Sequence, residues 1–206
     1  MFQELPLFPL HSVVFPGGAL PLRIFESRYL DLIKDCMRNE HGFGIVLIKN
    51  DKESGKGIGK EVSQEVGKAA EVYKTGTECR IADWETLPDG LLGITAYGEH
   101  RIHIEQTRIE PNQLLIGEIQ RLQDNPEVEL PEEFEVMRRM LQKIIMQVGQ
   151  PYTGLPAAYD NAGWVGARLT ELLPLQLVIK QRLLEIDDHL VRLYHLKEAM
   201  QELKLL

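Results

Sequence analysis

Few residues in this chain have the type and spacing that catalysis needs. The chain has four serines, namely Ser12, Ser27, Ser54 and Ser63. None stands in the G-x-S-x-G or S-x-x-K patterns that activate a serine nucleophile. Glu26 and Arg28 could be an acid and its partner, but two positions apart at a helix start they are more typical of residues that bond backbone groups or form a surface ion pair. We predict no catalytic residues.

Histidines and acidic residues offer little for a metal. His100 and His103 fall on a predicted strand, where positions i and i+3 face opposite sides, so the two rings cannot share an ion. Asp187-Asp188-His189 falls in a predicted helix, where adjacent side chains diverge. We therefore predict no metal site.

A lysine- and glycine-rich stretch comes close to a nucleotide-binding loop. A P-loop reads G-x-x-x-x-G-K-[ST], in which backbone amides and the lysine hold phosphates and the hydroxyl holds magnesium. Residues 55–61 read GKGIGKE, one residue short and with Glu61 in place of the hydroxyl residue. The pattern is more typical of a mobile hairpin loop over residues 49–61, and we predict no cofactor.

Charge and cysteine content limit the possible functions. The net charge is -8, with 14 Lys and Arg against 18 Asp and Glu in residues 1–123 and 9 against 13 in residues 124–206. Such an acidic balance argues against DNA binding and against RNA binding of a general kind. Cys36 and Cys79 form no CxxC motif, and no signal-peptide or membrane-spanning pattern is present. We predict a cytoplasmic protein that does not bind membranes.

The N-terminal ribbon, residues 5–29, combines prolines and phenylalanines with a high apolar content. Proline favours extended geometry before it and cannot donate to a sheet, so short edge strands and tight turns are expected, with Gly17-Gly18 at positive φ. From Glu26 apolar residues recur at helical spacing, which predicts a helix that ends at His41-Gly42.

The remaining sequence predicts strands and then helices. The expected strands are 43–48, 69–74, 78–86, 91–97, 101–109 and 114–122, with Gly98 as one of the turn signals. Their spacing suggests a small mixed barrel with one inserted helix. The expected helices are 131–148, a short one around Trp164 to Leu172, and one long helix from Leu175 to Met200. We predict two subdomains, a β-barrel at 1–123 and a helical bundle at 124–206.

Two surfaces could take part in recognition. Trp84 is expected to pack on its hairpin, and the alternative is a projecting aromatic that binds a partner. The apolar stripe from Leu175 to Met200 is expected to be core. Together with the run-out 203–206 it is also a possible self-association surface.

Several stretches resemble the substrate-binding N-terminal domain of the ATP-dependent Lon protease family. They are LPLFPL at 5–10, VFPG at 14–17, LPLRIFESRY at 20–29, GKAAEV at 67–72, PDG at 88–90 with GEHR at 98–101, ELLPL at 171–175 and KQRLLE at 180–185. The resemblance implies an α+β fold in which a PUA-like mixed β pseudo-barrel precedes a C-terminal helical bundle. The full protease also has ATPase and Ser-Lys peptidase modules, and this sequence contains neither a Walker motif nor a Ser-Lys context.

The leading hypothesis is a non-catalytic module that binds exposed hydrophobic or extended polypeptide, as the family's domain is held to do. Edge strands of the ribbon could accept an added strand. The expected peptide-binding residues are Phe8, Phe15, Phe25, Glu26, Arg28, Tyr29 and Trp84. The alternatives are an RNA-binding PUA-like module, an enzyme acting between barrel and bundle, and an accessory or regulatory protein that shares only the protease family's name.

Overall fold

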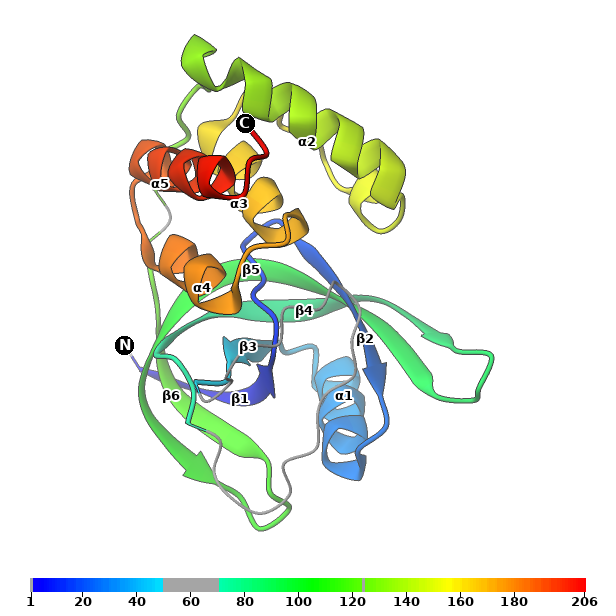
Figure 1. Ribbon diagram of the computed structural model, residues 1–206. Helices are drawn as coiled ribbons and strands as arrows, with labels where there is room; N and C mark the ends of the chain where they lie inside the picture. The colour runs from blue at the N-terminus through cyan, green and yellow to red at the C-terminus, as the bar shows by residue number, and fades with distance from the viewer. Residues whose placement is uncertain (1, 50–70, 124) are drawn as a thin grey trace.

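The computed structural model describes residues 2–49, 71–123 and 125–206. They form a mixed sheet with helix α1 on one side and helices α2 to α5 on the other (Figure 1). The strands are β1 (Gln3–Leu10), β2 (Ala19–Ile24), β3 (Phe43–Leu47), β4 (Thr75–Thr86), β5 (Leu92–Ile109) and β6 (Leu115–Arg121). The helices are α1 (Ser27–Asn39), α2 (Glu135–Val148), α3 (Ala162–Leu172), α4 (Leu177–Glu185) and α5 (His189–Glu202), with short 3-10 turns at Glu132–Phe134 and Tyr152–Gly154.

Strand β5 organises the sheet, whose order is β2-β5-β4-β3-β1-β6. It also pairs with β6. The strands β5, β4, β3, β1 and β6 therefore form a closed ring of paired neighbours. The predicted α+β class is confirmed, whereas the PUA-like description stays a prediction. The two strands of the ribbon occupy different positions in the sheet. β2 is an edge strand, as expected, but β1 lies between β3 and β6, so the prediction of an edge strand there was wrong.

Two predicted strand boundaries also differ. Gly98 is not a turn but an interior residue of β5, where the ribbon crosses the strand. A Cβ at Gly98 would lie 2.3 Å from the carbonyl oxygen of Phe15, and backbone hydrogen bonds join Gly98 to Gly17 and Gly18. The glycine therefore permits a close approach, not a turn. Of the expected strand 69–74, the described residues form only an isolated bridge between Ile48 and Val72.

Helix α1 ends differently from the prediction. Its left-handed residue is Glu40, with φ of 54°, and not Gly42. Gly42 is required for another reason, because a Cβ there would lie 2.6 Å from the carbonyl oxygen of Cys79 on β4. The end of α1 is thereby held against β4.

The expected long C-terminal helix is two helices. Asp188 caps α5, because its Oδ1 accepts the backbone N–H groups of Leu190 and Val191. A carboxylate at this position stabilises a new helix start. Arg101 of β5 donates to the carbonyl oxygen of Leu184 at 3.1 Å and pairs with Asp187 at 2.7 Å, which holds the end of α4. The continuous apolar stripe concealed this break, and the expected placement of residues 187–189 within one helix was wrong.

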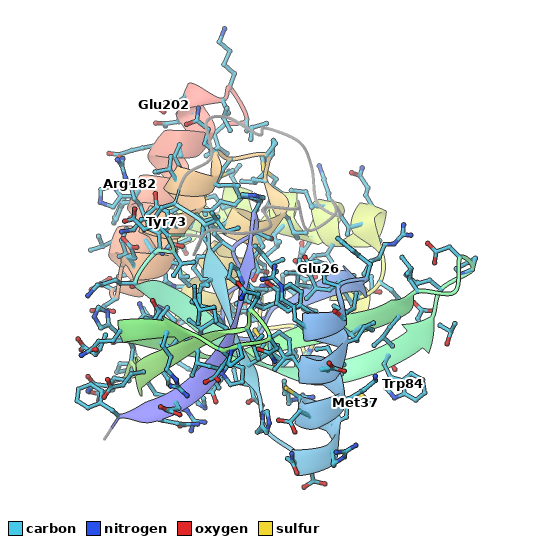
Figure 2. All side chains as sticks on the ribbon, turned by 90° about the horizontal axis from the view of Figure 1, so that it is seen from below. Glu26, Met37, Tyr73, Trp84, Arg182 and Glu202 are labelled. Atoms are coloured by element: carbon cyan, nitrogen blue, oxygen red, sulfur yellow. The ribbon has the colours of Figure 1, made fainter. Side chains whose placement is uncertain are left out.

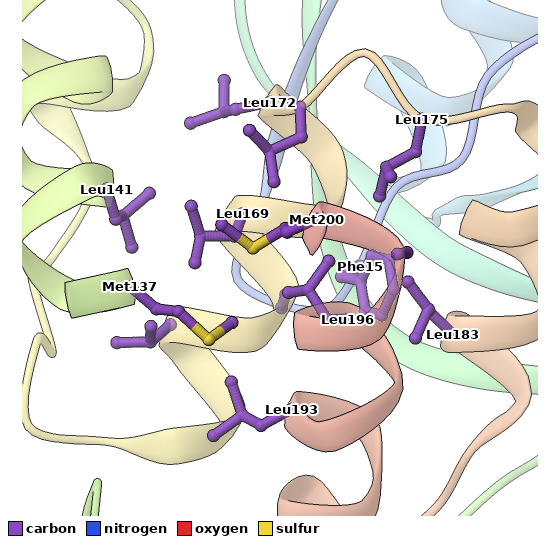
Figure 3. Close-up of a cluster of buried hydrophobic side chains, with 14 of the residues drawn as sticks. Phe15, Met137, Leu141, Leu169, Leu172, Leu175, Leu183, Leu193, Leu196 and Met200 are labelled. Carbon is purple, nitrogen blue, oxygen red and sulfur yellow. The ribbon is translucent and has the colours of Figure 1, made fainter. Parts of the chain in front are cut away.

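The helical layer has its own core, into which the ribbon inserts Phe15 (Figure 3). Phe15 is fully buried among residues of α3, α4 and α5, and Val13 and Leu47 join the same cluster. Helix α3 is the centre of this layer, because nearly all its residues are buried. Sheet and helices thus share a core across the division predicted at residue 123, and that division stays a prediction.

A buried ion pair fastens the ribbon turn to α3. The Arg168 and Glu171 side chains are almost inaccessible, with Arg168 Nη2 donating to Glu171 Oε1 at 3.0 Å. The same Oε1 accepts the backbone N–H of Phe15 at 2.7 Å, and Arg168 Nη2 also donates to the carbonyl oxygen of Pro16. A Cβ at Gly18 would lie 2.2 Å from that carboxylate oxygen. The glycine pair in the ribbon therefore makes room for the ion pair.

We expect stability to depend on pH through Lys180, whose Nζ donates to the Glu171 carbonyl oxygen at 2.6 Å. Burial, partly offset by the Glu171 carboxylate, lowers the pKa of Lys180 to about 8. An unfolded lysine has a pKa of about 10.4, so between about pH 8 and 10 the unfolded chain binds more protons. The free energy of unfolding should therefore rise with pH across this window, by roughly 1–2 kcal/mol.

Urea denaturation of the wild type and of Lys180→Met, compared at each pH, checks this because other titrating groups cancel in the difference. Lys143→Met, on the exposed side of α2, is the matched control. A wild-type-minus-variant difference that stays constant from pH 8 to 10 would contradict the assignment.

Candidate functional site: a groove along the free edge of β4

The outer half of β4 has a free edge. Strand β3 pairs with β4 only at residues 77–79, whereas β5 continues to pair with it as far as Thr86. Among the described residues, no strand pairs with the other edge of β4 from Arg80 onward. A free edge presents unpaired backbone donors and acceptors that another extended chain can use.

A groove of about 550 Å³ lies between this edge and the end of α1. We call it the β4-edge groove. Its lining residues are Cys36, Met37, Glu40, His41, Gly42, Arg80, Ile81, Ala82, Asp83, Trp84 and Glu99. Its volume is within the range of small ligand pockets.

Trp84 and Met37 form the exposed apolar part of the groove (Figure 2). Trp84 is 57% exposed and Met37 is 45% exposed. The expected packing of Trp84 on its hairpin was wrong, because the β4 residues after Cys79 extend beyond the core and nearly all of them are exposed. An exposed indole beside an open strand edge is a feature of recognition surfaces.

The groove carries unbalanced negative charge. Arg80 Nε lies 3.1 Å from Glu99 Oε1, and its guanidinium lies over the Tyr97 ring. His41 Nε2 lies 2.9 Å from Asp35 Oδ2. A hydrogen bond to the Gly42 carbonyl and the Asp35 carboxylate both raise the pKa of His41.

Two further carboxylates, Glu40 and Asp83, line the groove. In the described part of the chain, neither is joined to a cation by an ion pair. Asp83 Oδ1 instead accepts the backbone N–H of Trp84 at 2.8 Å. The groove is therefore acidic overall.

Three of the expected peptide-binding residues lie in the core. Phe8, Phe15 and Tyr29 are all nearly inaccessible, and the rings of Phe8 and Tyr29 stack at 3.9 Å. Burial raises the pKa of Tyr29 to about 12. In this conformation these three side chains have no surface with which to contact a peptide.

Phe25, Glu26 and Arg28 remain partly accessible near the start of α1. Arg28 Nε donates to Glu26 Oε2 at 2.8 Å, and Arg28 Nη1 donates to the Gln113 carbonyl oxygen. The expected structural ion pair is therefore present. Glu26 and Trp84 lie toward opposite ends of α1 (Figure 2), so the expected residues do not form one surface. Their binding roles stay predictions.

The groove residues contributed by α1 and by the start of the β4 edge were not among the expected site residues. Met37 lies within the expected first helix, and Arg80 and Asp83 lie within the expected strand 78–86. One signal was available in the sequence. The stretch RIADWET at 80–86 lacks the regular apolar alternation of a half-buried strand, which indicates an exposed one.

A second groove, of about 500 Å³, lies between α4 and α5. It is lined by Ile179, Arg182, Leu183, Glu185, Ile186, His195, Glu198, Ala199 and Glu202. Most of the C-terminal stripe is core, as expected. Self-association through this face stays a prediction.

Within residues 2–49, 71–123 and 125–206, no group of three or more His, Cys, Asp or Glu is arranged to hold a metal ion. The expected hairpin loop and the P-loop-like stretch lie almost wholly outside the described residues. None of the described helices has the length and apolar content needed to cross a bilayer. The cytoplasmic location stays a prediction.

A mixed sheet covered by a helical layer, with a groove at an open edge, defines an α+β domain with a surface suited to binding. The model of the ATP-dependent protease La (LON) substrate-binding domain matches residues 4–202. The chain belongs to this family, which confirms the resemblance seen in the sequence.

The relatives agree with this assignment. The chain is 28% identical over 155 residues to a Lon protease of Anaeromyxobacter dehalogenans, covering 75% of this chain and 17% of that protein. It is 24% identical over 204 residues to a Lon protease of Bacillus thuringiensis, covering 96% and 24%. The chain thus spans about a fifth of the length of these curated relatives.

Solved structures show the same fold. A Lon N-terminal domain protein from Xanthomonas campestris is 35% identical, with a TM-score of 0.72 over 95% of this chain and 98% of that one. The N-terminal domain of a Mycobacterium avium complex Lon protease superposes with a TM-score of 0.59, covering 97% and 98% of the two chains. At 15% identity the latter supports the fold alone.

Proposed function

We propose that this chain is a non-catalytic module that binds exposed hydrophobic or extended segments of polypeptides, with the β4-edge groove as its binding site. Family membership supports a substrate-binding role. The proposal that the ligand is a polypeptide rests on the open edge of β4 beside the exposed Trp84. An extended segment can add a strand to such an edge, with affinity from main-chain hydrogen bonds and selectivity from side-chain contacts.

The groove has the parts that such a mode needs. The edge supplies backbone partners from Arg80 onward, and Met37 and Trp84 supply apolar contact on the adjoining surface. Met is adaptable in shape and Trp is frequent at binding hot spots, a combination that suits varied sequences.

Trp84→Ala should weaken binding of an unfolded polypeptide about tenfold, since one buried aromatic anchor contributes about 1.4 kcal/mol or more. The free energy of unfolding should change by less than about 0.5 kcal/mol, because the ring is exposed. Titration of a labelled, permanently unfolded model protein, followed by anisotropy, measures the first quantity, and urea denaturation measures the second.

Met146→Ala is the matched control, because Met146 is an 81% exposed apolar residue on α2, outside the groove. Equal losses in the two variants would indicate non-specific apolar adsorption. If the wild type shows no saturable binding at all, the proposal is wrong.

The RNA-binding alternative has less support. The net charge of -8 and the carboxylates of the β4-edge groove oppose contact with phosphates. A salt-sensitive shift with structured RNA at physiological ionic strength would favour that alternative instead.

A further inference from the structure

We infer that the β4-edge groove selects cationic segments, in which an apolar centre is flanked by lysine or arginine, over acidic segments of the same apolar content. This inference rests on the proposed function and adds the chemical class of the ligand. It follows from how the charges in the groove are paired.

The cations of the groove are already paired, whereas two of its carboxylates are not. Arg80 pairs with Glu99, and His41 pairs with Asp35. Glu40 and Asp83 have no ion-pair partner among the described residues. A ligand entering the groove therefore meets two carboxylates without a cationic partner.

The position of Glu40 keeps its carboxylate available. Glu40 follows α1 in a left-handed conformation with φ of 54°, and its side chain is exposed. Gly42, which directly approaches Cys79 on β4, holds this end of α1 beside the edge. The negative charge is thus held next to the backbone groups that would pair with a ligand.

Asp83 adds a second charge to the groove, and Trp84 adds an exposed aromatic ring at the next position of β4. Asp83 Oδ1 accepts the backbone N–H of Trp84, and Trp84 is 57% exposed. One basic side chain of the ligand can pair with the Asp83 carboxylate, and a neighbouring one can contact the exposed indole of Trp84 through a cation–π interaction. A glutamate at either position would be repelled by the groove carboxylates or would gain no attraction from the ring face.

The apolar centre of the ligand has its own partners. Met37 and Ile81, one from each wall of the groove, provide the apolar contact. The net charge of -8 on the whole chain adds long-range attraction for cationic segments. The favoured partner is therefore an extended segment that is both apolar and basic.

The test uses three fluorescein-labelled peptides with one Val-Leu-Val centre, flanked by lysines, by glutamines or by glutamates. We expect the lysine peptide to bind the wild type at least about tenfold more tightly than the glutamate peptide at low salt, since two close charges contribute on this order. The preference should shrink at high salt because exposed charges are screened.

The variant Glu40→Gln with Asp83→Asn should reduce the lysine preference to about twofold or less. Asparagine retains an oxygen that can accept the Trp84 N–H, so the local structure is kept. The matched control is Glu185→Gln with Glu202→Gln, which removes the same charge from the α4–α5 groove and should leave the preference unchanged.

The outcomes separate the two proposals. If the glutamine peptide and the unfolded model protein bind through Trp84 but the lysine and glutamate peptides bind equally, the charge selection is wrong and the proposed function stands. A lysine preference that only the control variant removes would place the site in the α4–α5 groove and overturn the inference. If no peptide and no unfolded protein binds, both proposals are overturned.

Discussion

Replacing Arg168 with methionine should lower the free energy of unfolding by about 3–5 kcal/mol, because it leaves the Glu171 carboxylate buried without its cation. Both side chains of this pair are almost inaccessible to solvent. The carboxylate also holds the backbone N–H of Phe15, so its environment decides how firmly the ribbon is fixed to α3. Urea denaturation followed by circular dichroism measures the loss.

A double-mutant cycle separates the free energy contributed by the ion pair from the free energy lost with the packing of the Arg168 side chain. Arg168→Met with Glu171→Gln removes both charges and keeps an oxygen acceptor for the Phe15 N–H. We expect the double variant to recover more than half of the stability lost in Arg168→Met, because a neutral pair carries no uncompensated buried charge.

Arg139→Met is the surface control. Arg139 pairs with Glu135 at 2.8 Å, also within one helix, but its side chain is 72% exposed. An exposed pair contributes about 0.3–0.5 kcal/mol. A loss of that small size in Arg168→Met would show that the buried pair does not fasten the two layers.

Local apolar periodicity predicted most of the elements, including α1, α2 and α3 and the strand character of residues 78–122. Such patterns report which side of an element faces the core. They do not report contacts between segments distant in sequence. Gly98 therefore predicted a turn, although its function is to admit the backbone of Phe15. The helix break at the Asp188 cap was likewise missed, because Asp188 falls within a continuous apolar stripe.

The candidate site was harder to predict because it depends on how strands pair. Trp84 is exposed because β4 continues beyond β3, and the sequence of β4 does not show where its partner ends. Aromatic content pointed to the ribbon, whose rings are partly core. The family could be identified from the motifs, and in this chain Phe8, Phe15 and Tyr29 within those motifs are core residues. The groove residues could be identified only from the three-dimensional arrangement.

Phe15→Ala should lower the free energy of unfolding by about 3–5 kcal/mol, the usual cost of removing a fully buried phenylalanine side chain. Phe15 inserts into the helical core (Figure 3). The Arg192 guanidinium lies 5.4 Å from the centre of its ring. Chemical denaturation provides the measurement. Phe2→Ala is the matched control, because Phe2 is 57% exposed and its loss should cost less than about 0.5 kcal/mol.

The same residue tests whether the ribbon acts through packing or through direct contact with a peptide. Phe15→Leu keeps most of the buried volume and should cost about 1–2 kcal/mol, leaving the protein folded. If Phe15 acts through packing, this variant should bind unfolded polypeptide within about twofold of the wild type, while Trp84→Ala loses about tenfold. If a stably folded Phe15→Leu variant binds unfolded polypeptide more weakly than this, the Phe15 ring itself contacts the ligand. The binding site would then lie at the ribbon and not at the β4-edge groove.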